Sequence, residues 1–210
     1  MAQFFSLHPE FPQPRLIRQA AEIMRAGGLV AFPTDSAYAL GGLTGDADLL
    51  QRIRRLRGVD ERHHFTLMCR DLSEIAKYAR VDNAQYRLLK AVTPGPYTFI
   101  LEGTKELPRR VLHPKRKTIG LRVPEHPVVA ALLQELDEPI LTSTLLLPDD
   151  DFPLTDPEEI RERLEKQVEL VIEAGYCGPE ATTVIDLTSG APVLIRAGRG
   201  DLAPFGLEND

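Results

Sequence analysis

A short apolar run that ends at a proline constrains this chain more than any other feature. Residues 29–32 (LVAF) are all apolar; Gly27 and Gly28 precede them and Pro33 follows. A run this short, without polar alternation and bounded by glycine and proline, is typical of a strand that is covered on both faces. Pro33 cannot donate a hydrogen bond to a neighbouring strand, so the strand should end there.

The segment after Pro33 is rich in oxygen-bearing side chains. Thr34, Asp35, Ser36 and Tyr38 follow the apolar run within a few residues. Open α/β sheets bind ligands just beyond the carboxyl ends of their strands, so this segment is a candidate binding loop. The residues alone leave an equal alternative, because Thr, Asp and Ser also cap helices and glycine also closes turns.

Composition places the chain among globular proteins. Of the 210 residues, 43% are hydrophobic and 27% are charged, and no apolar stretch approaches the roughly 20 residues of a membrane span. The first residues lack the basic start of a secretory signal, so we expect a cytoplasmic protein. Cys69 and Cys177 fit no metal or redox spacing. His63 and His64 are adjacent and would point to opposite faces of a strand, so no protein-bound metal is expected.

Charge is divided unevenly along the chain. Residues 1–127 hold 20 Lys and Arg against 13 Asp and Glu, whereas residues 128–210 hold 5 against 18. Such asymmetry can mark a surface for phosphates or RNA. The candidate RNA-binding residues are Arg54, Arg55, Arg109, Arg110, Lys115, Arg116 and Lys117. The alternative for each cluster is a solvated helix face or a basic loop.

Strands and helices interleave along the chain. Apolar spacing, with proline and glycine at the boundaries, predicts helices over residues 14–26, 46–57, 71–78, 82–92, 127–136 and 158–166. It predicts strands over residues 29–32, 65–69, 97–102, 118–123, 139–145, 168–173, 182–187 and 192–196. This alternation predicts one α/β domain with a mixed, largely buried sheet and helices packed against it.

Common catalytic signatures are missing from the sequence. It contains no P-loop, G-x-G-x-x-G, G-x-S-x-G or H-E-x-x-H motif, which argues against the simplest ATPase, dehydrogenase, hydrolase and metalloprotease readings. Five separated segments, taken in order, are more specific. They are residues 33–41 (PTDSAYALG), the helix ending at Arg57 with residues 65–68 (FTLM), residues 93–101 (TPGPYTFIL), residues 120–124 (GLRVP) with His126-Pro127, and residues 182–186 (TTVID) before residues 195–198 (IRAG).

In this order the segments resemble the YrdC-like family, the threonylcarbamoyl-adenylate synthases of tRNA modification, and within it the YciO branch. The resemblance covers about residues 10–200 and leaves 201–210 as a loose C-terminal tail. It implies a single domain with a twisted open mixed sheet, flanking helices and a basic concave face. It also implies an enzyme that joins L-threonine, bicarbonate and ATP, with Mg²⁺, into threonylcarbamoyl-AMP and pyrophosphate for the modification of adenosine 37 of tRNAs.

The resemblance also assigns roles to individual residues. It implies catalytic roles for Arg57 and Arg122, where Arg57 stands for the lysine of the synthases' K-x-R motif. It implies substrate-binding roles for Thr34, Asp35, Tyr38 and Thr183, and nucleotide-binding roles for Ser143 and Arg196. These residue types suit a reaction that needs positioning and charge neutralisation more than a protein nucleophile.

Two departures from the family pattern put activity in question. The second basic residue of K-x-R falls at Val59, and the amide of the synthases' S-x-N motif is replaced by Leu145. A hydrogen bond to a charged group contributes roughly 1.5–3 kcal/mol, so two losses could weaken nucleotide binding or turnover strongly. Neighbouring Arg54, Arg55, Arg62 or His64 could compensate. Two alternatives therefore stay open: a non-catalytic protein that binds double-stranded RNA or tRNA, and an adenylate-forming enzyme that uses another amino acid.

Overall fold

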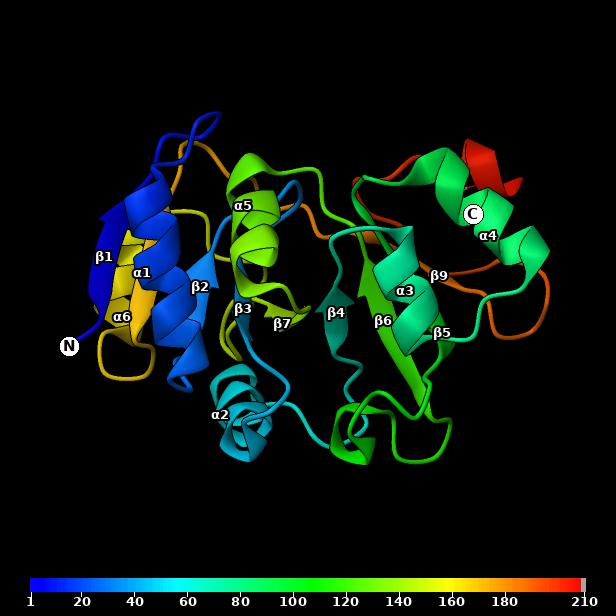
Figure 1. Cartoon of the computed structure of the whole chain (residues 1–210), viewed down its shortest axis with the longest axis horizontal. Helices are drawn as coiled ribbons and strands as arrows, with labels where there is room; N and C mark the ends of the chain where they lie inside the picture. The colour runs from blue at the N-terminus through cyan, green and yellow to red at the C-terminus, as the bar shows by residue number, and fades with distance from the viewer. Residues whose placement is uncertain (209–210) are drawn as a thin grey trace.

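The predicted buried strand lies inside a ten-stranded mixed sheet. The computed structural model describes residues 1–208, and Figure 1 shows the sheet running along the long axis of the molecule. The strands are β1 (Gln3–Ser6), β2 (Val30–Phe32), β3 (Ala39–Gly42), β4 (Thr66–Met68), β5 (Tyr97–Glu102), β6 (Thr118–Arg122), β7 (Ile140–Thr144), β8 (Leu170–Glu173), β9 (Thr183–Asp186) and β10 (Val193–Arg196). Their order is β1-β8-β2-β3-β7-β4-β6-β5-β9-β10. The expected single α/β domain with an open mixed sheet is confirmed.

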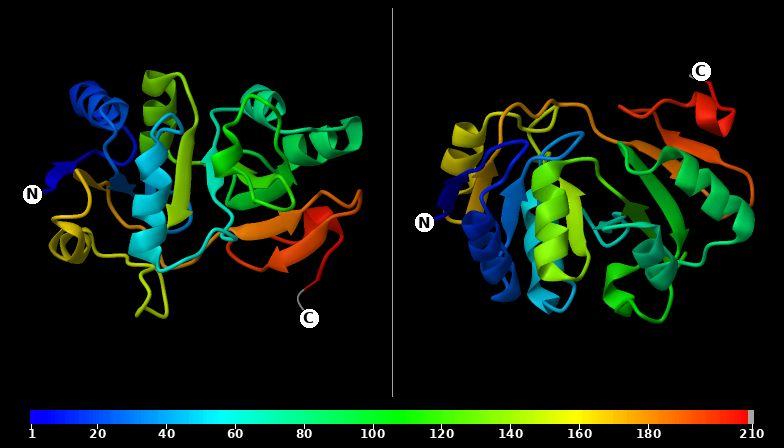
Figure 2. Two further views of the ribbon diagram at one scale, coloured as in Figure 1. Left: turned by 90° about the horizontal axis from the view of Figure 1, so that it is seen from below. Right: turned by 45° about the horizontal axis from the view of Figure 1, so that its top comes forward.

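Helices cover the sheet in two groups. They are α1 (Pro14–Arg25), α2 (Ala47–Arg57), α3 (Leu72–Tyr78), α4 (Asn83–Val92), α5 (Pro127–Leu136) and α6 (Pro157–Leu164). Helices α1 and α5 pack on each other and on β2, β7 and β8 in one apolar cluster. Helices α2 and α6 lie on the other side of the sheet, as Figure 2 shows. Their buried residues belong to a second apolar cluster, which also contains residues of α3 and α4. Within residues 1–208, none of the helices is long and apolar enough to cross a membrane.

Local signals explain where α2 begins and ends. The Asp46 side chain accepts a hydrogen bond from the Asp48 backbone N–H at 2.9 Å and so caps the first turn. Gly58 ends the helix with φ +62°, a conformation that glycine adopts at little cost. Leu49, Leu50, Ile53 and Leu56 are buried, so the arginines between them stay off the apolar stripe. Arg57 is thereby fixed at the carboxyl end of α2.

The segment after β2 contains a strand that the sequence did not reveal. Residues 33–42 were expected to form one polar loop, but β3 already begins at Ala39 and pairs with β2 and β7. A Cβ atom on Gly41 would lie 2.9 Å from both Phe32 and Ile140 side chains, so this glycine permits close packing in a strand rather than a turn. Strand β1, parallel to β8, was also missed.

The C-terminal segment is packed, contrary to the expected loose tail. Leu202 and Phe205 are each 8% exposed, and a short 3₁₀ turn, η2 (Ala203–Phe205), places the Phe205 ring against Tyr97 and Phe99. The Tyr97 hydroxyl also donates to the Asp201 carbonyl at 3.0 Å. The sequence gives no periodic signal over so few residues, and the aromatic contacts are formed with strands about a hundred positions away. Residues 209–210 lie outside the described part of the chain.

Strand β10, which forms one edge of the sheet, carries an irregularity in its pairing with β9. Leu194 pairs with Ile185, whereas Arg196 pairs with Val184, so two residues of β10 face one residue of β9. Such a bulge inserts one residue and reverses the side of the sheet to which the following side chains point.

The packing of η2 predicts a clear effect on stability. Phe205→Ala should lower the free energy of unfolding by about 2–4 kcal/mol, because it removes a buried aromatic ring. Phe152→Ala is the matched control, since that ring is 71% exposed, and should change stability by less than about 0.5 kcal/mol. Urea unfolding measures both values, and equal effects would show that the C-terminal segment contributes nothing to the core.

Candidate active site

The loop after β2 is ordered by its own hydroxyl groups. Thr34 Oγ1 donates to the Ala37 carbonyl at 2.7 Å and accepts from the Ser36 backbone N–H at 3.0 Å. The Thr34 and Ser36 hydroxyl oxygens are 3.0 Å apart, and both residues are at most 4% exposed. The loop therefore presents a fixed set of polar atoms rather than a flexible turn.

Arg122 connects this loop to the far half of the sheet. It is the last residue of β6, its side chain is 5% exposed, and it forms an ion pair with Asp35. Its Nη1 atom donates to Ser36 Oγ at 3.2 Å, and the other Asp35 oxygen accepts from the Glu125 backbone N–H at 2.8 Å. Burial lowers the pKa of Arg122, and the charge of Asp35 opposes that effect. The predicted residues Thr34, Asp35 and Arg122 thus lie together.

One donor of Arg122 has no partner. Its Nε atom is buried and forms no hydrogen bond within residues 1–208. A buried guanidinium N–H without an acceptor is costly, so the arrangement favours an acceptor that is supplied by a ligand.

Two further residues, one in this loop and one packed against it, were given no individual role from the sequence. Ser36, inside the predicted loop, shares the Arg122 guanidinium with Asp35. Cys177 is 3% exposed and its thiol lies 3.7 Å from the carbonyl oxygens of both Thr34 and Ser36. Burial raises the pKa of Cys177, so the protonated thiol can donate to these carbonyls. A contact between residues so far apart in sequence leaves no local signal.

Tyr38, for which a substrate-binding role was predicted, lies in the core, and that role stays a prediction. It is fully buried in the core, and its hydroxyl donates to the Ile172 carbonyl at 3.1 Å. Burial raises its pKa above the ordinary value. Tyr38 therefore anchors the loop to β8. Its hydroxyl would have to leave the Ile172 carbonyl before it could bind threonine.

A second polar cluster forms around Ser143 in β7. The Arg57 guanidinium donates from Nη1 to Ser143 Oγ at 2.6 Å and from Nε to the Leu146 carbonyl at 2.7 Å. His63 Nε2 lies 3.0 Å from the same Ser143 oxygen. Burial and the positive charge of Arg196 lower the pKa of Arg57. The two predicted site residues Arg57 and Ser143 are thus in contact. The contact between His63 and Ser143 was not predicted.

Arg196 reaches this region from the edge of the sheet. Its Nε and Nη2 atoms donate to the Thr182 carbonyl at 3.2 and 2.9 Å. Thr182 in turn shares a hydrogen bond of 2.8 Å with Thr98. The bulge in β10 sets this geometry, because it pairs Arg196 with Val184 and so turns the side chain to the side of the sheet that Val184 and Thr98 share.

Thr183, for which a substrate-binding role was predicted, forms hydrogen bonds within the protein, and that role stays a prediction. It is fully buried, and its hydroxyl donates to the Gly200 carbonyl at 2.7 Å and accepts from the Gly198 N–H at 3.1 Å. A Cβ atom on Gly198 would lie 2.4 Å from the Ala181 carbonyl, so only glycine fits there. Thr183 and Gly198 together hold the segment that follows Arg196.

The candidate RNA-binding residues divide by their contacts. Arg116 pairs with Asp186 at 2.5 Å, Arg110 donates to the Thr44 carbonyl and Lys117 to the Pro114 carbonyl, so these three charges are partly engaged within the protein. Arg54 lies over the Phe65 ring. Arg55, Arg109 and Lys115 are exposed. A nucleic-acid surface formed by these residues stays a prediction.

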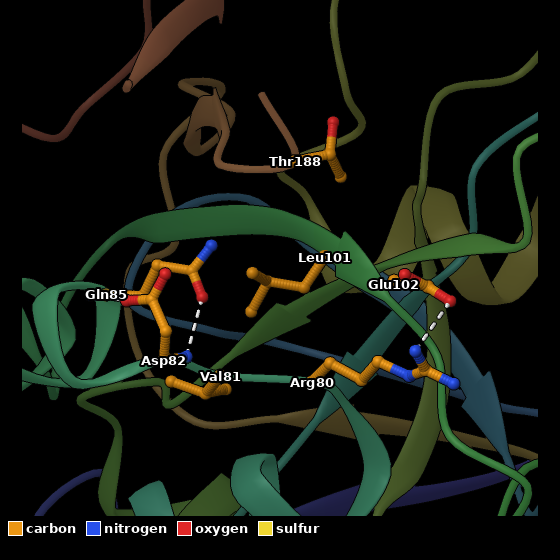
Figure 3. Close-up of a pocket in the computed structure, with 7 residues that line it drawn as sticks. All are labelled: Arg80, Val81, Asp82, Gln85, Leu101, Glu102 and Thr188. Carbon is orange, nitrogen blue, oxygen red and sulfur yellow. Dashed lines mark hydrogen bonds and ion pairs between the residues drawn. The ribbon is translucent and has the colours of Figure 1, made fainter. Parts of the chain in front are cut away.

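Two surface pockets lie outside these polar clusters. Figure 3 shows one of about 380 Å³, lined by Arg80, Val81, Asp82, Gln85, Leu101, Glu102 and Thr188. Its polar groups are paired with each other: Arg80 with Glu102 at 3.5 Å, and Asp82 with Gln85 in the cap of α4. The second, of about 440 Å³, lies at the end of α2 and is lined by Gln51, Arg54, Arg55, Gly58, Val59, Asp60 and Glu61. Val59, which stands where the synthases have a basic residue, therefore borders an open pocket together with Arg54 and Arg55.

Leu145, the other departure, is part of the core. It is fully buried in the cluster that α2 covers, and its backbone N–H donates to the Tyr38 carbonyl at 2.8 Å. An apolar residue here strengthens packing where an amide would supply a polar group.

Comparison with known proteins decides the family. A family model for the Sua5, YciO and YrdC proteins, described as "Telomere recombination", matches residues 22–198. The chain belongs to this family. It is 57% identical to YciO of Escherichia coli K12 over 98% of this chain and all of that protein. It is 32% identical to a threonylcarbamoyl-AMP synthase of Halorhodospira halophila, over 87% of this chain and 96% of that protein.

Solved structures agree with this assignment. The crystal structure of E. coli YciO matches with a TM-score of 0.95 over 98% of this chain and all of that one. Sua5 of Pyrococcus abyssi, in complex with L-threonine, matches with a TM-score of 0.85 and 27% identity over 93% of this chain and 57% of that one. The fold expected from the resemblance is thus the fold of the Sua5/YciO/YrdC family.

The buried ion pair predicts an asymmetric response to mutation. Asp35→Asn leaves Arg122 buried without a counter-charge and should cost about 3–5 kcal/mol of stability. Glu102→Gln is the matched control, because Arg80 and Glu102 are 71% and 51% exposed, and should cost less than about 1 kcal/mol. Urea unfolding at neutral pH compares them. Similar losses for both variants would contradict the importance of the Arg122 contact.

Proposed function

We propose that this protein is a threonylcarbamoyl-AMP synthase, or a weak relative of one, that joins L-threonine, bicarbonate and ATP. The observation that carries the proposal is the buried Arg122 guanidinium, which Asp35 and Ser36 hold beside the Thr34 loop with one N–H unpartnered. A charged, oriented donor in a buried site suits a carboxylate or carbamate. The homologous Sua5 structure in complex with L-threonine supports the choice of amino acid.

The two polar clusters suit the two substrates. Threonine would bind at the Thr34 loop and Arg122, and the ATP phosphates would bind near Arg57, Ser143 and Arg196. The threonine amine and bicarbonate give a carbamate and water, and a carbamate oxygen then attacks the α-phosphorus while pyrophosphate leaves. Negative charge develops on the phosphoryl oxygens, and arginines fixed by Ser143 and Thr182 would stabilise it without reorganisation.

Magnesium would enter with ATP. Across the described residues, no group of three or more His, Cys, Asp or Glu side chains is placed to hold a metal ion. Asp35, the carboxylate in the Thr34 loop, is committed to Arg122 and the Glu125 N–H. Phosphate oxygens and water would therefore supply most of the ligands of the ion, as is common for Mg²⁺–nucleotide complexes.

The proposal predicts that threonine-dependent pyrophosphate release depends on Arg122. The purified protein, incubated with Mg²⁺–ATP, L-threonine and bicarbonate, should release pyrophosphate in proportion to threonine. Arg122→Lys should reduce kcat/KM about tenfold to a hundredfold, because an ammonium cannot reproduce the fork geometry. Arg70→Lys, at an exposed pair with Asp137, is the control. A wild-type protein without threonine-dependent release, beside an active synthase, would refute the proposal.

A second function, binding of double-stranded RNA or tRNA, is favoured by the exposed Arg55, Arg109 and Lys115. Binding through phosphates should weaken steeply with salt, with a slope that falls by about one for each contacting cation removed. Titration of a labelled RNA duplex should give a smaller slope for Arg109→Gln and Lys115→Gln. Arg18→Gln, at an exposed position of α1, should leave the slope unchanged. A salt-independent affinity, or equal slopes for all variants, would reject RNA binding by this surface.

A further inference from the structure

The Ser143 hydroxyl is held between two basic side chains. Arg57 Nη1 lies 2.6 Å from Ser143 Oγ on one side, and His63 Nε2 lies 3.0 Å from it on the other. Ser143 is 4% exposed, so few other partners can reach its oxygen. The three residues come from α2, from the segment before β4 and from β7, and their contacts fix one another.

The donors and acceptors around Ser143 Oγ restrict how its hydroxyl can be oriented. A guanidinium can only donate, so Arg57 occupies one acceptor site of Ser143 Oγ. The hydroxyl has a single hydrogen of its own, and neutral His63 can accept it at Nε2. Protonated His63 would instead donate to Ser143 Oγ, and the serine hydrogen would then have to point away from both basic groups. In the tautomer of neutral His63 that carries its hydrogen on Nδ1, the protonation state of His63 therefore controls where the Ser143 hydroxyl points.

The surroundings of His63 keep it neutral in the free protein. Burial is the largest cause, and the positive charge of Arg57 is the next, so that the pKa of His63 falls to about 4. His64 and Arg54 act in the same direction, whereas Asp60 opposes them. The Phe65 ring meets the imidazole edge-on with ring centroids 5.4 Å apart and carries no charge. The charged neighbours are thus mainly cationic, and an anion bound among them would reverse their effect.

We propose that His63 is a positioning residue that takes up a proton when a phosphate group binds beside Arg57, and that this proton turns the Ser143 hydroxyl toward the phosphate. The inference rests on the proposed function, which places the ATP phosphates at Arg57, Ser143 and Arg196. The proton comes from solvent, and no covalent bond forms or breaks. Three donors, from Arg57, Ser143 and Arg196, would then converge on the ligand.

The sign of the pH effect follows from linkage. A group whose pKa is higher in the complex than in the free protein tightens binding as the pH falls below the value in the complex. If bound phosphate returns the pKa of His63 from about 4 to its ordinary 6.5, binding at pH 5 becomes about thirtyfold tighter than with a residue that does not titrate. The gain vanishes near pH 8, where His63 is neutral in both states.

Calorimetric titration with Mg²⁺–ATP between pH 5 and pH 8 tests this inference. His63→Gln keeps a nitrogen near the Nε2 position but does not titrate, and His8→Asn, at an exposed turn, is the control. ATP itself titrates in this range, so the measured quantity is the ratio of the variant and wild-type dissociation constants at each pH. We expect the ratio for His63→Gln to rise more than tenfold from pH 8 to pH 5, and the ratio for His8→Asn to stay near one.

The histidine itself can be followed in parallel by NMR. The Cε1 proton of His63, assigned by its loss in His63→Gln, should titrate near pH 4 in the free protein and at least one unit higher with saturating Mg²⁺–ATP. A constant ratio of dissociation constants, or an unchanged His63 titration in the complex, would overturn the inference while leaving synthase activity intact. Absence of nucleotide binding at every pH would overturn both the inference and the proposed function.

Discussion

The ion pair between Asp35 and Arg122 is the interaction on which the polar centre of the molecule depends. Asp35 follows β2 and Arg122 ends β6, and three strands of the sheet, β3, β7 and β4, lie between them. The second carboxylate oxygen of Asp35 accepts a hydrogen bond from the Glu125 N–H, so the pair fixes two backbone segments as well as two charges. A buried pair of this kind stabilises the fold weakly, but the loss of one partner is expensive. The interaction thus specifies geometry more than stability.

Polar groups elsewhere in the sheet follow the same logic. Most of the buried hydroxyls bind either a backbone carbonyl or another hydroxyl, as Thr98 and Thr182 do at 2.8 Å. Two arginines bind polar groups of the sheet: Arg57, at the end of α2, donates to Ser143, and Arg196, on the edge strand β10, donates to the Thr182 carbonyl. Arg57 is half-buried, which strengthens its contact with Ser143, whereas Arg196 is exposed. Such a site is ordered before any ligand arrives, which reduces the entropy lost on binding.

Local signals in the sequence predicted much of the fold. The apolar run before Pro33 and the apolar spacing over residues 46–57 are local signals, and the structure places β2 and α2 where they indicate. Strand β3 was missed because Gly41 looks like a turn residue until Phe32 and Ile140 are seen against it. The partners of Tyr38 are similarly distant in sequence.

The site was predictable only in part, for the same reason. The ordered motifs singled out Asp35, Arg122, Arg57 and Ser143, and the structure joins these four residues in two contacts. They did not reveal His63, whose imidazole meets Ser143 across 80 positions of chain, or Cys177, which lies beneath the Thr34 loop. The sequence also did not show that the Thr183 and Tyr38 hydroxyls bind backbone carbonyls, because a buried hydroxyl and a solvent-facing one are identical in sequence.

The bulge in β10 has a consequence for the protein's solubility. The strand ends a ten-stranded sheet, and Val193 and Ile195 are 45% and 54% exposed on it. A flat edge with such side chains is a template for pairing with another chain and for growth into aggregates. The inserted residue breaks the regular ladder at the point where the Arg196 side chain reaches the Thr182 carbonyl. A mutation that straightened this strand would therefore both misplace an arginine and open the sheet to polymerisation.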